Sequence, residues 1–168
     1  MTLGIIGVGF GRWLPARQPD MRRVVFFDGV CALCDGSVRF LIRADRTGLL
    51  RFAPLQGETA AREPAVAKLI EGEGAERDVA DRDGSELGSI IYLRGQGREQ
   101  EVLTRSAAVL AILDDLGGFW RLLSVARIVP AAIRDWVYDV IGRNRYRWFG
   151  RLEACRLPRE GEAELFLD

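Results

Sequence analysis

The chain has 168 residues, of which 48% are hydrophobic and 29% are charged, a length and composition typical of one independently folding domain. Its 24 basic residues balance its 24 acidic residues, so the overall charge provides no attraction to nucleic acid or to anionic lipid. The absence of histidine excludes Ser-His-Asp and Cys-His catalysis, histidine-ligated metals and an imidazole general base.

The first segment, residues 1–20, has no periodic pattern and precedes a second methionine, Met21. Its apolar run from Leu3 to Phe10 has neither the preceding basic residue nor the following cleavage site of a signal peptide. Arg12 stands where a dinucleotide-binding glycine motif needs its last glycine. No apolar run in the chain approaches the roughly 18 residues that span a bilayer. We therefore expect a poorly ordered, dispensable leader on a soluble protein that binds neither membranes nor nucleic acid.

A strand, a helix and a second strand are predicted next. Residues 24–27 are consecutive β-prone apolar residues, as in a strand buried on both faces. Residues 32–46 have helical spacing, and Gly48 follows where a helix can end. Residues 49–53 form a second strand, stopped by Pro54, which completes a βαβ unit with a right-handed crossover. The inward face of this helix is expected to contain Leu33, Phe40, Leu41 and Ala44.

The second half of the chain adds a helix, a hairpin and further helices. A helix is predicted around residues 64–71, followed by a polar loop over 72–88. Residues 89–93 and 99–104 flank a glycine-bearing connection and indicate a β-hairpin. Ser106 is the predicted N-cap of the next helix. That helix should end at Gly117-Gly118, with Val109, Leu110, Leu113 and Leu116 inward, and residues 119–149 continue as helix broken near Pro130.

The strongest chemical signal is the pair Cys31 and Cys34, spaced as CxxC where the first strand meets the helix. Two thiols three residues apart can close a disulfide, and the backbone N–H groups at a helix start favour the thiolate of the first. We expect the Cys31 thiol to face these N–H groups and solvent and to attack, and Cys34, one turn inside the helix and shielded, to resolve. The alternatives are two small buried side chains or half of a zinc site, whose further ligands are missing. This cysteine usage suits a reducing compartment, so we expect a cytoplasmic protein that needs no metal or organic cofactor.

Asp28 lies three residues before Cys31, at the end of the first strand. Its carboxylate could accept the proton of the resolving thiol or could cap the following helix, and the two roles are compatible. The stretch Phe26-Phe27-Asp28-Gly29 also resembles the nucleophile strand of haloacid-dehalogenase-type phosphatases. That motif needs a second aspartate where Val30 stands, so we disfavour a phosphatase.

Residues 143–151 interleave arginines with aromatic residues. Such a pattern could stack bases and pair with phosphates of single-stranded nucleic acid. We favour a helix end whose aromatic side chains pack inward while its arginines face solvent, because the overall charge is zero. A third alternative is that these arginines approach the CxxC pair and lower its pKa.

Residues 28–34, 143–150 and 155–158 together resemble the DCC family of thiol-disulfide oxidoreductases, which is named for its D-x-x-C-x-x-C pattern. The resemblance covers residues 22–158. It implies an α/β fold, a thioredoxin-like mixed sheet with flanking helices and a C-terminal helical extension. It also implies that Cys31 and Cys34 are the redox pair and Asp28 the third signature residue. Residues 84–89 lack the proline that thioredoxins place before the third strand, so substrate docking should differ.

We therefore predict one thioredoxin-like domain over residues 21–158, followed by a tail over 159–168. It should exchange disulfides with a protein or a low-molecular-weight thiol. The competing hypotheses are a non-catalytic interaction module on the same fold and a cysteine-based metal-binding or redox-sensing protein. The candidate substrate-binding residues are Arg145, Tyr146, Trp148 and Cys155, of which Cys155 should be at most auxiliary.

Overall fold

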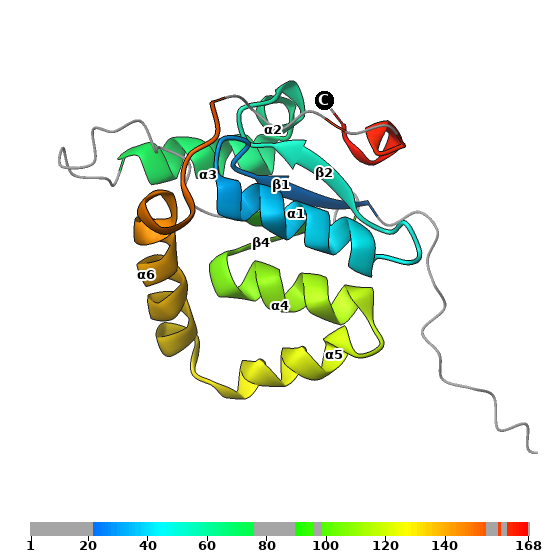
Figure 1. The fold of residues 1–168 in the computed structure, drawn as a ribbon, viewed down its shortest axis with the longest axis vertical. Helices are drawn as coiled ribbons and strands as arrows, with labels where there is room; N and C mark the ends of the chain where they lie inside the picture. Colours follow the sequence, from blue (N-terminus) through cyan, green and yellow to red (C-terminus); the bar gives the residue numbers. More distant parts are fainter. Residues whose placement is uncertain (1–21, 76–89, 96–98, 154–157, 159–160, 168) are drawn as a thin grey trace, which may run out of the picture.

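In the computed structural model, which describes residues 22–75, 90–95, 99–153, 158 and 161–167, a four-stranded mixed sheet lies at the centre (Figure 1). Its strands are β1 (Arg23–Phe27), β2 (Arg51–Pro54), β3 (Ile91–Arg94) and β4 (Glu101–Thr104), in the order β2-β1-β3-β4. β1 pairs parallel with β2 and antiparallel with β3, and β3 pairs antiparallel with β4. The carboxyl ends of β1 and β2 therefore meet at the same end of the sheet.

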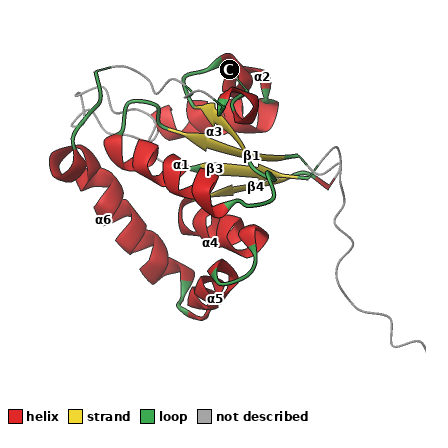
Figure 2. Cartoon of the chain, turned by 45° about the vertical axis from the view of Figure 1, so that its right-hand side comes forward, coloured by secondary structure: helices red, strands yellow, loops and turns green. Residues whose placement is uncertain are grey.

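Helices cover both faces of this sheet (Figure 2). They are α1 (Ala32–Ala44), α2 (Glu58–Arg62), α3 (Pro64–Ala75), α4 (Arg105–Leu116), α5 (Trp120–Leu123) and α6 (Ala131–Phe149), with short 3-10 helices η2 (Ser124–Ile128) and η3 (Ala163–Leu165). α1 and α4 pack on one face, and α2 and α3 pack on the other. Both views show α5 on the far side of α4 from the sheet, and α6 contacts α4 and α1.

The two faces of β1 build two separate cores because successive side chains of a strand point to opposite sides. Val25 and Phe27 join one core, and Val24 and Phe26 join the other. The first core is completed by Val38 and Leu41 of α1, Ala108, Ala111 and Ile112 of α4, and Phe166 of the tail. Ala60, Val66, Leu69 and Ile70 of α2 and α3 complete the second. Burial of each large apolar side chain contributes about 1.5 to 3 kcal/mol, so β1 fixes the centre of the fold.

The predicted fold class is confirmed. The βαβ unit, the β3–β4 hairpin, the helix after it and the helical break at Pro130 all occur, and together they make a thioredoxin-like α/β sheet with a C-terminal helical extension. α1 is two residues shorter than predicted, since Asp45 follows as its C-cap. Pro54 belongs to β2, which tolerates it because β2 is an edge strand. The short helix α2 was not predicted, and α3 continues to Ala75 although residues 72–75 were predicted to be loop. Residues 76–88 of that predicted loop lie outside the described residues.

Three predictions about individual side chains are wrong. Thr104, not Ser106, is the N-cap of α4, because the Ser106 hydroxyl instead donates a hydrogen bond to Asp135 of α6. Phe40 is 40% exposed and turns toward the extension, where its ring meets Trp120 edge-on with centroids 4.7 Å apart. Val109 is also exposed, because it faces a pocket between α1, α4 and α6. In each case a contact with the extension decides the direction of the side chain.

The predicted leader, residues 1–20, lies outside the described residues. Within the part of the chain that the structure describes, no helix is both long enough and apolar enough to cross a bilayer.

Candidate active site

Cys31 is the N-cap of α1, directly after the loop that follows β1. The Cys31 Sγ accepts a hydrogen bond from the backbone N–H of Cys34 at 3.4 Å. An N-cap side chain lies beside the unpaired N–H groups of the first helical turn and the positive end of the helix dipole. The expected position of Cys31 at the helix start is therefore confirmed, and a thiolate is favoured there.

The pKa values of the two thiols are shifted in opposite directions. A hydrogen bond from the Cys34 side chain is the largest of the effects that lower the pKa of Cys31 to about 6, and the Cys34 N–H and the charge of Arg145 act in the same direction. Burial and the charge of Asp28 oppose them. The same side-chain hydrogen bond, followed by burial, raises the pKa of Cys34. At neutral pH the site accordingly holds a thiolate at Cys31 and a thiol at Cys34.

Cys31 is nevertheless fully buried, with 0% of its surface exposed. Three residues that follow α6, which we call the C-terminal strap (residues 150–152), lie across it. The Ala32 N–H donates to the Gly150 carbonyl at 3.4 Å, the Leu152 N–H donates to the Val30 carbonyl at 2.9 Å, and Cys31 forms a β-bridge with Arg151. The expectation that the Cys31 thiol faces solvent while Cys34 is shielded is therefore wrong: Cys34 is the more exposed thiol.

Asp28 is buried at the end of β1 and accepts four hydrogen bonds. Its Oδ1 accepts from the Val30 N–H at 3.2 Å and from the Gln56 side-chain amide at 3.0 Å. Its Oδ2 accepts from the Arg145 guanidinium at 2.9 Å and from the Tyr146 hydroxyl. Burial, followed by the hydrogen bond to Asp28, raises the pKa of Tyr146 to about 12, so its hydroxyl keeps its proton at neutral pH. Asp28 does not cap α1; it ties β1 to α6.

Arg145 reaches this site from the middle of the arginine-rich segment. Its side chain is only 5% exposed and that of Asp28 only 4%, so the two form a buried ion pair across 117 residues of sequence. The guanidinium also lies 4.7 Å from the centre of the Tyr146 ring. Of the three alternatives for residues 143–151, the approach of an arginine to the CxxC pair is the one that holds for Arg145. This arginine does not face solvent.

Gln56 is a site residue that the sequence analysis missed. It follows β2, and its side-chain oxygen accepts from the Gly29 N–H at 3.3 Å while its amide nitrogen donates to Asp28. The signal was available, because the carboxyl ends of parallel neighbouring strands meet at one end of a sheet. Gln56 thus hydrogen-bonds to two residues, Asp28 and Gly29, of the loop between β1 and α1.

Replacing Gln56 with leucine should lower the free energy of unfolding by about 1 kcal/mol, because two hydrogen bonds to the loop before Cys31 are lost. Gln56→Glu keeps an acceptor for Gly29 but places a second carboxylate against Asp28, so it should destabilise the protein more than leucine does. Urea denaturation of the three proteins measures this order. Equal stability of the wild type and both variants would show that Gln56 does not support the loop.

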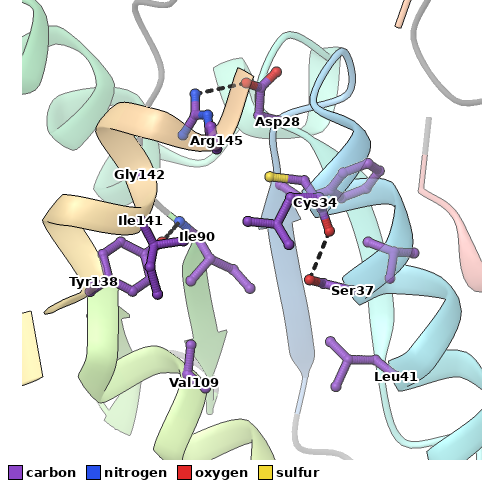
Figure 3. A pocket seen from close by; sticks show the side chains of 13 residues that line it. Asp28, Cys34, Ser37, Leu41, Ile90, Val109, Tyr138, Ile141, Gly142 and Arg145 are labelled. Carbon is purple, nitrogen blue, oxygen red and sulfur yellow. Dashed lines mark hydrogen bonds and ion pairs between the residues drawn. The ribbon is translucent and has the colours of Figure 1, made fainter. Parts of the chain in front are cut away.

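A pocket of about 110 Å³ opens beside Cys34, between α1, α4 and α6 (Figure 3). Its lining is mostly apolar and includes Leu33, Val38, Val109 and Ile141, while Asp28 and Arg145 lie at one end. Tyr138 closes another side, and its hydroxyl accepts from the Ile90 N–H at 2.9 Å. A group that enters this pocket reaches Cys34 in an apolar environment.

The remaining predicted site residues do not join this constellation. Trp148 is more than half exposed and its ring packs against Phe149. Cys155 lies outside the described residues. Among the residues that the structure does describe, no three His, Cys, Asp or Glu side chains are grouped so that they could hold a metal ion.

Comparison with known proteins extends the similarity over most of the chain. Residues 25–151 match the sequence profile of a family described as DCC1-like thiol-disulfide oxidoreductase. The chain is 37% identical over 145 residues to the uncharacterized protein YuxK of Bacillus subtilis (strain 168), covering 86% of this chain and 93% of that protein. It is 31% identical over 141 residues to the chloroplastic DCC family protein At1g52590 of Arabidopsis thaliana, covering 83% and 72% of the two chains. No solved structure matches the chain significantly.

Proposed function

Because the chain belongs to the DCC1-like thiol-disulfide oxidoreductase family, we propose that it is an enzyme that exchanges disulfides through Cys31 and Cys34. The observation that carries the proposal is that one thiol of the pair favours its ionised form and the other its protonated form. Cys31 is an N-cap thiol with a pKa of about 6, and Cys34, whose thiol donates to it, lines an open pocket. A nucleophile that is ionised at neutral pH beside a protonated second thiol is what exchange requires.

The reaction consumes one substrate disulfide and oxidises the protein dithiol. The Cys31 thiolate attacks one sulfur of the substrate, a Cys31–substrate disulfide forms, and the other substrate sulfur leaves as a thiolate that takes a proton from solvent. Cys34 then loses its proton, and its sulfur attacks Cys31. A Cys31–Cys34 disulfide forms and the second substrate thiolate leaves, so two electrons pass from the protein to the substrate.

We propose Asp28 as the acceptor of the Cys34 proton. Asp28 and Cys34 line the same pocket, which supports this role. The carboxylate is already occupied by four donors, so accepting a proton requires it to release one of them, and the side-chain donors of Gln56, Arg145 and Tyr146 can turn away where the Val30 N–H cannot. Arg145 acts as a positioning residue, since its charge stabilises both Asp28 and the Cys31 thiolate.

The pocket supports a substrate class. An apolar side chain next to the substrate's cysteine can occupy the space beside Cys34, which favours protein or peptide disulfides, or a low-molecular-weight disulfide with an apolar part. Arg145 lines this space and Tyr146 reaches it through its hydrogen bond to Asp28, whereas the exposure of Trp148 offers no support for a role in substrate binding. The exchange needs no metal or organic cofactor, and its reductant would be a cytoplasmic thiol.

The burial of Cys31 favours a second candidate, a redox-responsive interaction module without turnover. A thiol under the strap reacts only when the strap moves away. A disulfide-reduction assay separates the two candidates, with dithiothreitol as the electron donor and glutathione disulfide or a small protein disulfide as the substrate. We expect turnover above the rate of a Cys31→Ser/Cys34→Ser double variant. Equal rates for the two proteins would reject the enzyme and favour the module.

Alkylation of Cys31 should rise through a midpoint at about pH 6 and then level off, because the reactive thiolate is the form present above the pKa. A free thiol has its midpoint at about 8.5. Cys34→Ala removes the hydrogen bond that contributes most to the shift, so the midpoint should move upward. Cys34→Ser keeps a hydroxyl donor and should move it less. Iodoacetamide labelling followed by mass spectrometry reads Cys31 alone, and a midpoint near 8.5 in the wild type would contradict the assignment of the thiolate.

A further inference from the structure

The C-terminal extension exposes an apolar surface. Of the fifteen large hydrophobic residues exposed in the described chain, twelve lie between Phe119 and Phe149. Ile128 is 81% exposed and Trp136 is 65% exposed. The others in this stretch are Phe119, Leu122, Leu123, Val125, Val129, Ile133, Val137, Ile141, Trp148 and Phe149. Single exposed hydrophobic residues are normal on a protein surface, but a concentration of this size in α5, η2 and α6 marks an interaction site.

On α6, apolar side chains occupy part of the solvent-exposed face, where polar side chains are expected. Ile133, Val137 and Ile141 follow one another at four-residue spacing and therefore share one face of the helix. Ile141 also borders the pocket beside Cys34, which Tyr138 and Arg145 line as well, so it lies at the edge of this face. A surface helix that only packs on its own domain turns its apolar residues inward. α6 has a packed face and, in addition, an exposed apolar one.

The same segment is strongly basic, although the whole chain is neutral. Residues 119–149 contain six arginines and two acidic residues, a net charge of +4. Arg121 and Arg127 are paired with Asp114, and Arg145 is paired with Asp28. Arg143 and Arg147 are exposed, and among the described residues neither has an acidic partner. The exposed Arg143 and Arg147 thus lie on the same helix as the exposed Trp136 and Trp148.

We propose that this face, which we call the basic apolar face (residues 119–149), binds the surface of an anionic lipid bilayer. Apolar side chains that enter the headgroup region bury their surface there, aromatic rings such as Trp136 and Trp148 prefer that level, and arginines pair with lipid phosphates. The protein would lie on the bilayer and not cross it. The zero net charge of the chain conceals this affinity, because the compensating acidic residues lie in other elements.

Two other partners fit the same face less well. Nucleic acid would use the arginines and tryptophans, but it offers nothing to aliphatic side chains such as Ile128, Leu122 and Ile133. A second copy of the chain, docked symmetrically through this segment, would place two net-positive surfaces against each other, and like charges repel. An anionic bilayer satisfies the aliphatic, aromatic and basic groups at the same time.

Flotation with lipid vesicles tests the proposal with the full chain. We expect the protein to float with vesicles of phosphatidylcholine mixed with phosphatidylglycerol, and to float much less with phosphatidylcholine alone or in high salt. Arg143→Gln/Arg147→Gln should lower the partition coefficient by about 25-fold, about fivefold for each arginine. Ile128→Ser should lower it about tenfold. The matched control Arg62→Gln/Lys68→Gln removes two exposed charges from α2 and α3, on the other face of the sheet, and should bind like the wild type.

Tryptophan quenching by brominated phosphatidylcholine in the mixed vesicles distinguishes insertion from loose electrostatic attraction. Quenching is expected in the wild type and should be lost in Trp136→Phe/Trp148→Phe. The proposal is overturned if the control lowers binding as much as the Arg143 and Arg147 variant does, or if tryptophans are not quenched. It is also overturned if a single-stranded oligonucleotide displaces the vesicles, or if sedimentation shows a dimer whose formation protects Trp136 and Trp148 and abolishes flotation.

Discussion

Replacing Cys31 with serine should abolish disulfide exchange, because serine at the N-cap can accept the Cys34 N–H but cannot attack a disulfide at neutral pH. Cys34→Ser should instead attack once and stop, holding the substrate in a mixed disulfide with Cys31. Intact-mass spectrometry after reaction with glutathione disulfide reads the two outcomes directly. The Cys31 variant should gain no adduct, and the Cys34 variant should gain one stable adduct that dithiothreitol removes.

Serine is nearly the size of cysteine and preserves the cap, so both variants are expected to fold, and circular dichroism provides the control. The burial of Cys31 makes this test demanding, since Cys34 is the thiol that lines the pocket. A stable adduct on Cys34 in the Cys31→Ser protein, together with full turnover, would reverse the roles of the two thiols. Partial turnover without either adduct would favour a reaction at another cysteine.

Arg145→Leu should be among the most destabilising single substitutions in the chain. It leaves the buried Asp28 carboxylate without its cation, and breaking one partner of a buried pair costs about 3 to 5 kcal/mol of unfolding free energy. Asp28→Leu/Arg145→Leu removes both charges and should recover much of the loss. Urea denaturation measures both, and Arg62→Leu, which breaks a fully hydrated pair with Glu58, is the matched control with at most about 1 kcal/mol.

Substitutions of the two partners of this ion pair should shift the pKa of Cys31 in opposite directions. The charge of Arg145 lowers this pKa and the charge of Asp28 raises it, so Arg145→Leu should raise it and Asp28→Asn should lower it further. Arg145→Lys keeps the charge and should leave it nearly unchanged. Thiolate absorbance in the ultraviolet, followed against pH in the reduced Cys34→Ser background, reads the shift. Movement in the same direction in both variants would mean that the pair acts only through the fold.

The sequence predicted what local pattern determines. The apolar run of β1, the CxxC spacing and the helical period of α1 place Asp28 directly after β1, and Cys31 and Cys34 at the start of α1, and the structure agrees. Arg145 and Gln56 could not be placed in the same way. They reach Asp28 from 117 and 28 residues away, so their position depends on how α6 and β2 pack. Long-range packing of this kind leaves no periodic trace in the chain.

The predicted directions of side chains in the extension were wrong for a related reason. A helical pattern shows which residues share a face, but not which face meets the domain. In residues 143–151 the aromatic Trp148 and Phe149 were expected inside and the arginines outside, whereas Arg145 is inside and the two aromatic residues are exposed. The buried Asp28 supplies the missing information, because one unpaired carboxylate in a core is sufficient to bring an arginine inward.

Because the strap lies over Cys31, the reactivity of this thiol depends on how often the strap opens as well as on the pKa of the thiol. If residues 150–152 must detach before a reagent reaches the Cys31 sulfur, the observed rate is the intrinsic thiolate rate multiplied by the open fraction. Each 1.4 kcal/mol or so that stabilises the closed strap slows every oxidant tenfold, whatever its chemistry. Once reagent is abundant, the rate should cease to depend on its concentration and should equal the opening frequency. A closed strap of this kind would keep a thiolate of pKa about 6 from being consumed by ordinary oxidants.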